Sequence, residues 1–229
     1  MAHIHSFAIS ERGVSETNDD SFCAERIGSY EVFAVASGRS GIGRKASEIA
    51  INSLRDTVKN NTHDPSEILV KAVADADLKI GERDGQKRLH AGLGTDLCAC
   101  LVDDNLDCTI LDTGNGSVYY ISPDSGIVIP REIPFAEKSG SLLKKVISHT
   151  LGEPIVLKDS EFHRVNLLNS FMVLSSSGLY DYVKREEIKS VVEINDENVE
   201  TSCEALKNQA LQAGSDRTIT LIILHGHDD

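Results

Sequence analysis

The chain has 229 residues, a formal net charge of −13, 40% hydrophobic residues and 26% charged residues. These proportions are typical of a globular protein, whereas the acidic balance disfavours nucleic acid and anionic membrane surfaces, because both require a basic protein surface. No apolar run approaches the roughly 20 residues that a membrane-spanning helix needs. We therefore expect neither a nucleic-acid partner nor a membrane partner.

The five cysteines are odd in number and include no CxxC pair. This usage favours reduced thiols and a cytoplasmic location. Cys98 and Cys100 form a CxC pair on one face of a strand-like run. Metal ligation by this pair is an alternative, but burial in a sheet is the interpretation that we prefer.

The first half of the chain predicts strands followed by two helices. Period-two and helical apolar spacing predict strands over residues 1–8, 21–27 and 30–36 and helices over residues 46–54 and 68–80. The first strand carries His3 and His5 on one face. Such a pair can bind a metal, but near a terminus we expect the two side chains to face solvent.

The second half predicts a meander of strands, a late helix and a last strand. Its strands are predicted over residues 95–102, 108–112, 117–121, 127–129, 161–165, 171–174 and 218–224, and its helices over residues 142–148 and 197–211. The tail His225-Gly226-His227-Asp228-Asp229 could bind a metal. We expect a frayed end there. Strands in hairpins with grouped helices predict an α+β fold with antiparallel sheets.

A glycine-rich turn separates a predicted strand from a helix at residues 38–43. Residues 41–46, Gly-Ile-Gly-Arg-Lys-Ala, match the dinucleotide fingerprint G-x-G-x-x-A. That site needs a second parallel strand next, whereas this chain predicts a second helix. A P-loop is the weaker reading, because Arg44 and Lys45 stand where Lys and Ser or Thr are required.

Seven short segments carry a further pattern. They are Gly13 with Asn18-Asp19-Asp20-Ser21, Phe33–Gly38, Gly94-Thr95, Asp112–Tyr119, Ile147–Gly152, Leu174–Asp181 and Ser215–Thr220. No single segment is specific, but in this order they resemble the bacterial-type domain of the type 2C family of metal-dependent Ser/Thr protein phosphatases. The resemblance implies one domain over residues 1–229, with a reduced flap region at 123–160. It also implies a four-layer α-β-β-α sandwich of two antiparallel sheets flanked by helices.

The resemblance implies phosphate hydrolysis by water at two Mg²⁺ or Mn²⁺ ions held by carboxylates. The family's ligand positions are retained at four residues: Asp19, Asp20, the carbonyl of Gly38, and Asp216. Five family positions are changed: Ser15 replaces the phosphate-gripping Arg, Ser37 the bridging Asp, Asn115 the Asp of a third metal, Ser177 the Asp of the Ser-Asp-Gly motif, and Arg217 the closing Asn. Hydroxyls and amides do not supply the negative charge that holds these cations.

We therefore predict a catalytically impaired pseudophosphatase with a binding or regulatory role, and we assign no catalytic residue. No cofactor is expected to bind with high affinity. The expected partner is a protein, with a phosphoprotein as one option. A phosphate group could be bound by Arg39, Arg44 and Lys45, which the resemblance places near the rim of the family's active-site cleft. That they are solvated loop charges is an equal interpretation.

The alternative is a weakly active metal-dependent Ser/Thr phosphatase. Asp19, Asp20 and Asp216 would then recruit one Mg²⁺ or Mn²⁺, with Asp112 or Asp181 compensating for the lost carboxylates. A separate hypothesis concerns Arg217, which we expect to act as an internal counter-ion where a metal would otherwise lie.

Overall fold

The computed structural model describes residues 2–38, 43–84, 94–113, 118–123, 126–128, 163–195 and 198–228. In chain order, its elements are β1 (Ala2–Glu11), β2 (Asp20–Ile27), β3 (Tyr30–Gly38), α1 (Gly43–Lys59), α2 (Pro65–Asp84), β4 (Thr95–Val102), β5 (Asp107–Asp112), β6 (Val118–Ser122), β7 (Gly126–Val128), β8 (His163–Asn166), β9 (Ser170–Ser175), α3 (Ser177–Tyr180), α4 (Arg185–Ile194), α5 (Val199–Gln212) and β10 (Ile219–Asp228).

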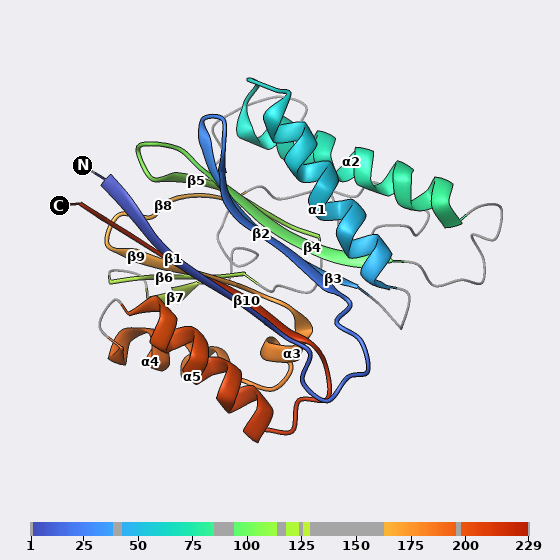
Figure 1. Ribbon diagram of the computed structural model, residues 1–229. Helices are drawn as coiled ribbons and strands as arrows, with labels where there is room; N and C mark the ends of the chain where they lie inside the picture. Colours follow the sequence, from blue (N-terminus) through green and yellow to red (C-terminus); the bar gives the residue numbers. More distant parts are fainter. Residues whose placement is uncertain are drawn as a thin grey trace.

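The strands form two five-stranded sheets in which every neighbouring pair is antiparallel. One sheet has the order β1-β10-β9-β6-β7 and the other the order β2-β3-β4-β5-β8. Helices α1 and α2 cover the outer face of the second sheet, whereas α4 and α5 lie on the outer face of the first (Figure 1). The predicted α+β class and the four-layer sandwich are confirmed.

Alternating side chains divide the core into three layers, because successive residues of a strand point to opposite faces of a sheet. On β3, Phe33 and Val35 pack between the two sheets, whereas Val32 and Ala34 pack under α1 and α2. Strand β10 alternates in the same way between the inter-sheet core and the layer under α3, α4 and α5. This alternation also decides which polar residues face the space between the sheets where the strands end.

The structure corrects two expectations about the second half. The tail expected to fray belongs to β10, which pairs with β1 from Glu11↔Ile219 to Ala2↔Asp228. Ten consecutive backbone partners on β1 hold it in place. Helix α4 was not predicted, although its buried Ile188 and Val192 have helical spacing. The late helical layer therefore contains more than the single helix that we expected.

All five cysteines are free and buried, which agrees with the reduced thiols expected from the sequence. In the part of the chain that the structure describes, no helix is both long and apolar enough to cross a membrane. Several expectations lie outside the described residues: the helix at 142–148, the motif at 147–152, Arg39, Asn115 and most of the flap region at 123–160.

Candidate functional site

The candidate site lies between the two sheets, where β2, β3 and β4 bring three polar residues into one row. Asp20 on β2 is the register partner of Ser37 on β3, and Ser37 is the register partner of Asp96 on β4. Register partners in an antiparallel sheet lie side by side on the same face. Ser37 has the orientation of Val35, which faces the inter-sheet core. The two acidic residues therefore flank Ser37.

The carboxyl group of Asp20 has one oxygen that is shielded from solvent. Burial raises the pKa of Asp20 from 3.8 to about 6, whereas the hydroxyls of Ser176, Thr220 and Ser37 oppose the rise. Its Oδ2 atom is buried and has no hydrogen-bond partner among the described residues. The Ser176 hydroxyl also lies 3.1 Å from the Thr218 carbonyl oxygen. The Asp20 carboxyl group thus lies among hydroxyl groups, and the nearby Asp19 charge adds to the rise of its pKa.

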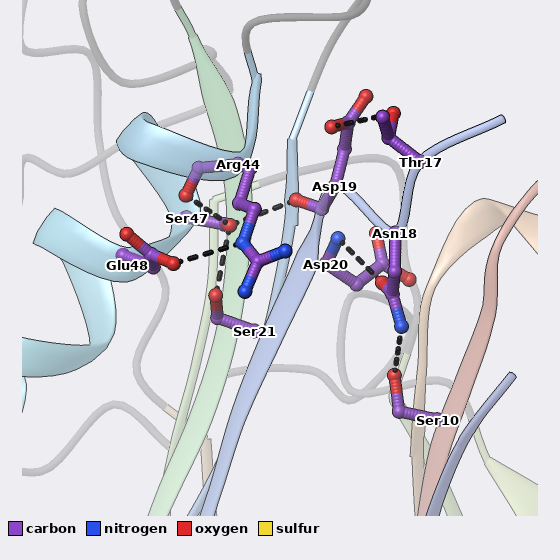
Figure 2. A network of polar contacts seen from close by, with 9 residues as sticks. All are labelled: Ser10, Thr17, Asn18, Asp19, Asp20, Ser21, Arg44, Ser47 and Glu48. Atoms are coloured by element: carbon purple, nitrogen blue, oxygen red, sulfur yellow. Dashed lines mark hydrogen bonds and ion pairs between the residues drawn. The ribbon is translucent and has the colours of Figure 1, made fainter. Parts of the chain in front are cut away.

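Asn18 fixes the start of β2 against the other sheet. Its side-chain oxygen accepts a hydrogen bond from the Asp20 backbone N–H at 3.0 Å, and its side-chain nitrogen donates to Ser10 Oγ at 2.9 Å. Ser10 Oγ in turn lies 2.8 Å from Thr220 Oγ1 on β10. Figure 2 shows Asn18 between Asp20 and Ser10. These contacts hold the Asp20 backbone in position relative to both sheets.

The backbone carbonyl oxygen of Asp19 contacts both β3 and α1. This atom accepts a hydrogen bond from the Gly38 N–H at 3.2 Å. It accepts a second one from Ser47 Oγ at 2.8 Å, which Figure 2 shows. Its Oδ1 atom accepts a hydrogen bond from Thr17 Oγ1 at 3.1 Å. The Asp19 carboxylate is therefore held on the loop before β2, and its carbonyl joins β3 to α1.

The glycines that resemble a phosphate cradle have a packing role at the two ends of the turn. A Cβ atom on Gly38 would lie 2.4 Å from the carbonyl carbon of Gly43, and one on Gly43 would lie 2.3 Å from that of Gly38. Real Cβ atoms do not approach the backbone this closely. Glycine is required at both positions because the end of β3 and the start of α1 touch directly.

The remaining predicted positions lie around α3 and the chain before β10. Ser177 begins α3, and a Cβ on Gly178 would lie 2.0 Å from the Thr218 carbonyl oxygen. Ser15 Oγ donates a hydrogen bond to the Asp216 carbonyl oxygen at 3.1 Å. This contact brings residue 15, near the first segment of the pattern, next to residue 216 in the last segment.

The exposed Asp216 carboxylate is hydrogen-bonded to a tyrosine. Tyr182 Oη donates to Asp216 Oδ1 at 2.5 Å, and this bond lowers the pKa of Asp216, with a smaller contribution from Arg217. The Arg217 guanidinium forms its ion pair with Asp181. The predicted counter-ion role of Arg217 thus has Asp181 as its main partner, and Arg217 affects Asp216 only through the field of its charge.

Two hollows border the row of polar residues. A cleft of about 360 Å³ opens between α1, β1 and β2, and its walls include Asn18, Asp20, Arg44 and Arg55. A second cavity, of about 10 Å³, lies between the sheets and is lined by Ser37, Asp96, Cys98, Ser175, Ser176, Ser177, Tyr180 and Val35. The smaller cavity is at the limit of what one water molecule needs.

The donor set does not fit the two-metal centre implied by the resemblance. Two hard cations need several converging carboxylates. In the described ranges, no group of three or more His, Cys, Asp or Glu side chains is placed to hold a metal. Asp20 faces hydroxyls, while the Asp19 and Asp216 carboxylates are hydrogen-bonded to Thr17 and Tyr182. We therefore derive no reaction step through metal ions.

Sequence reasoning missed Asp96 and Tyr182. A signal for Asp96 was present, since it follows the Gly94-Thr95 motif and opposes the end of β3 in an antiparallel pair. Nothing in the sequence indicates the bond between Tyr182 and Asp216, because 34 residues separate them. That contact depends on how α3 packs against the residues before β10.

No family model and no curated protein sequence matches this chain. Solved structures do match it over its full length. The Mycobacterium tuberculosis serine/threonine phosphatase PstP/Ppp has 20% identity and a TM-score of 0.76, covering 97% of this chain and 98% of that one. The catalytic domain of PstP in complex with two manganese ions has 22% identity and a TM-score of 0.79, covering 100% of both chains.

A third structure is PppA, a key regulatory component of T6SS in Pseudomonas aeruginosa. It has 16% identity and a TM-score of 0.73, and the match covers 99% of this chain and 100% of that one. Identities of this size indicate a shared fold and leave function to the residues of the site. This chain has the fold of the bacterial type 2C Ser/Thr protein phosphatases.

Proposed function

We propose that this chain is a pseudophosphatase: one type 2C domain over residues 1–229, with a reduced flap at 123–160, that binds a protein partner in a regulatory role. It has lost efficient metal-dependent hydrolysis. The observation that carries the proposal is the pairing of Asp20 with Ser37, in a site where hydroxyls face the carboxyl group of Asp20. We further propose that it works in the cytoplasm.

The electrostatics of the row explain why serine is favoured at position 37. An aspartate there would lie directly between Asp20 and Asp96. Without a cation, each close pair of carboxylates costs up to about 4 kcal/mol at an effective dielectric constant near 20. Serine removes that repulsion. A site released from metal binding would be expected to keep the serine, because the domain is then stable without a cation.

The cleft beside Asp20 supports binding of a protein segment. Arg44 and Arg55 border it, and each is paired with a glutamate: Arg44 Nε with Glu48 Oε1 at 3.0 Å, and Arg55 Nε with Glu25 Oε1 at 2.6 Å. These pairs are exposed and exchange partners at low cost. A phosphorylated side chain can therefore take over either guanidinium. We propose a phosphoprotein as the partner.

The second candidate is a weakly active Ser/Thr phosphatase that uses one Mg²⁺ or Mn²⁺. The buried Asp20 Oδ2 atom without a partner favours it, as does Asp96, which adds a carboxylate on the other side of Ser37. The PstP catalytic domain in complex with two manganese ions shares the fold, which also supports this candidate.

One experiment separates the two candidates. Mn²⁺ is titrated into the purified chain by calorimetry, and hydrolysis of p-nitrophenyl phosphate is assayed in parallel with and without Mn²⁺. The pseudophosphatase proposal predicts no saturable binding below millimolar Mn²⁺ and no metal-dependent turnover. Tighter binding with turnover that Asp20→Asn abolishes would establish the weakly active enzyme instead. Asp56→Asn, on the exposed face of α1, is the matched control.

A further inference from the structure

Strands β1 and β10 bring together two His-x-His segments from opposite ends of the chain. His3 is the register partner of His227, and His5 is the register partner of His225. Residues two apart on a strand share a face, as do register partners. All four imidazoles therefore lie on the outer face of the first sheet, on the side that Leu221 and Ile223 of β10 present to the late helices.

The other three rings all lie near that of His227. The ring centroids of His5 and His227 are 4.4 Å apart, those of His225 and His227 are 5.7 Å apart, and those of His3 and His227 are 6.1 Å apart. Two imidazoles bound to a tetrahedral zinc ion have centroids about 5 Å apart, because each Zn–N bond is about 2.1 Å long. His227 is the central ring of the cluster.

The cluster contains one buried ring, one half-buried ring and two exposed rings. His225 is 3% exposed and stacks on Phe171 with a centroid distance of 4.2 Å. The Nδ1 atom of the half-buried His227 is shielded from solvent and has no hydrogen-bond partner among the described residues. The side chains of His3 and His5 are exposed. In the present rotamers the rings are stacked or tilted and do not converge, so binding requires the two exposed side chains to rotate.

We propose that His3, His5 and His227 form a binding site for a divalent transition-metal ion of the zinc class. Neutral imidazole nitrogens suit zinc and disfavour Mg²⁺ and Mn²⁺, which prefer oxygen ligands. His225, fixed on Phe171, positions the neighbouring His227 ring. A bound ion ties β1 to β10 and so joins the first and last strands of the described chain.

This site is separate from the cleft of the proposed function. The cleft reaches β1 at Ser10, five residues from His5, which is about 17 Å along a strand. The five cysteines, which have the strongest affinity for zinc among side chains, are all buried. Zinc binding by the full chain therefore reports on the histidines, and an Asp20→Asn variant keeps this site while changing the cleft.

Calorimetric titration of the full chain with Zn²⁺ tests the proposal. We expect saturable binding of one ion per chain, weakened at least about tenfold by His5→Ala and by His227→Ala. His63→Ala is the matched control, because His63 is an exposed histidine before α2 on the other layer, and it should leave the affinity unchanged. Asp20→Asn should also bind as the wild type.

A second readout is thermal unfolding followed by circular dichroism. Zn²⁺ should raise the midpoint of the wild-type chain and of His63→Ala, and it should leave that of His5→Ala unchanged, since only a bound ion stabilises the folded state. His5 is exposed, so this variant is expected to fold even if His227→Ala does not. Absence of saturable Zn²⁺ binding by the wild type, or wild-type affinity in His5→Ala, would overturn the proposal.

Discussion

Asp20 on β2 and Ser37 on β3 are direct partners across the strand pair, and the carboxyl group of Asp20 is buried beside that serine. In the phosphatase family that the sequence resembles, the position of Ser37 holds the carboxylate that bridges two metals. We expect the relationship between these two residues to affect both the stability of the site at neutral pH and its capacity for cations.

Replacement of Asp20 by Asn tests the cost of this burial. A pKa raised from 3.8 to about 6 means that the folded state prefers the protonated acid. The contribution of protonated Asp20 to the stability of the folded state is therefore fully present below the unfolded pKa. It is lost as the pH rises through about 6. The rise corresponds to roughly 3 kcal/mol at neutral pH.

Asp20→Asn, which is always neutral, should therefore raise the free energy of unfolding at pH 7.5 by about 1–3 kcal/mol. Most of this gain should vanish as the pH falls from 6 to 4. Urea denaturation of both proteins across this range measures it. A variant less stable than the wild type at pH 7.5 would contradict the assigned burial.

Tyr182→Phe removes the hydrogen bond that lowers the pKa of Asp216. The pKa of Asp216 should rise towards its usual value, as followed by NMR of the side-chain carboxyl carbon against pH. A lowered carboxyl pKa stabilises the folded state above the unfolded pKa and loses that contribution as the pH falls. The variant should therefore be slightly less stable at neutral pH. Tyr180→Phe is the control, and an equal effect of both variants would exclude the specific bond.

Gly38→Ala tests the direct contact between the end of β3 and the start of α1. The added Cβ would meet the backbone of Gly43 and Asp19 at 2.4 and 2.5 Å, and backbone atoms cannot move aside cheaply. We expect a loss of about 3 kcal/mol or more in the free energy of unfolding. Gly28→Asn is the control, because its Cβ has open space and Asn tolerates a φ of +60°. Similar small losses in both variants would refute the contact.

Arg217 and Asp181 form an exposed ion pair, with side chains 53% and 41% exposed. Exposed pairs contribute about 0–1 kcal/mol. A double-mutant cycle of Arg217→Asn and Asp181→Asn, measured by urea denaturation, should give a stabilising coupling energy within that range. A stabilised Arg217→Asn variant at neutral pH would exclude a counter-ion role for this arginine.

The strand and helix pattern of the sequence was sufficient to predict the α+β class, and the order of motifs was sufficient to predict the sandwich. Local periodicity identified β2, β3, α1 and α2, because their apolar faces are complete within each segment. The extent of β10 was missed because His225 and His227 are polar. Their inclusion in the strand depends on pairing with β1, more than 200 residues earlier, and no local signal reports it.

Only part of the candidate site could be predicted, because its side chains come from segments that are far apart in the sequence. Matching of motifs assigned Asp20 and Ser37 separately to family ligand positions, and the structure makes the two residues neighbours. Contacts made by side chains from distant motifs could not be inferred, as the pairs Tyr182 with Asp216 and Arg217 with Asp181 illustrate. The metal-ligand roles of Asp19, Asp20, Gly38 and Asp216 remain predictions from the resemblance.

The most direct test of the account restores the two missing carboxylates. Ser37→Asp combined with Ser177→Asp should bind Mn²⁺ at least about tenfold more tightly than the wild type in calorimetry, because acidic ligands hold hard cations. The same variant should be less stable than the wild type without Mn²⁺. Ser29→Asp, in the exposed turn between β2 and β3, is the control, because it adds a carboxylate outside the candidate site. Wild-type chain that binds Mn²⁺ as tightly as the restored variant would contradict the loss of the metal site.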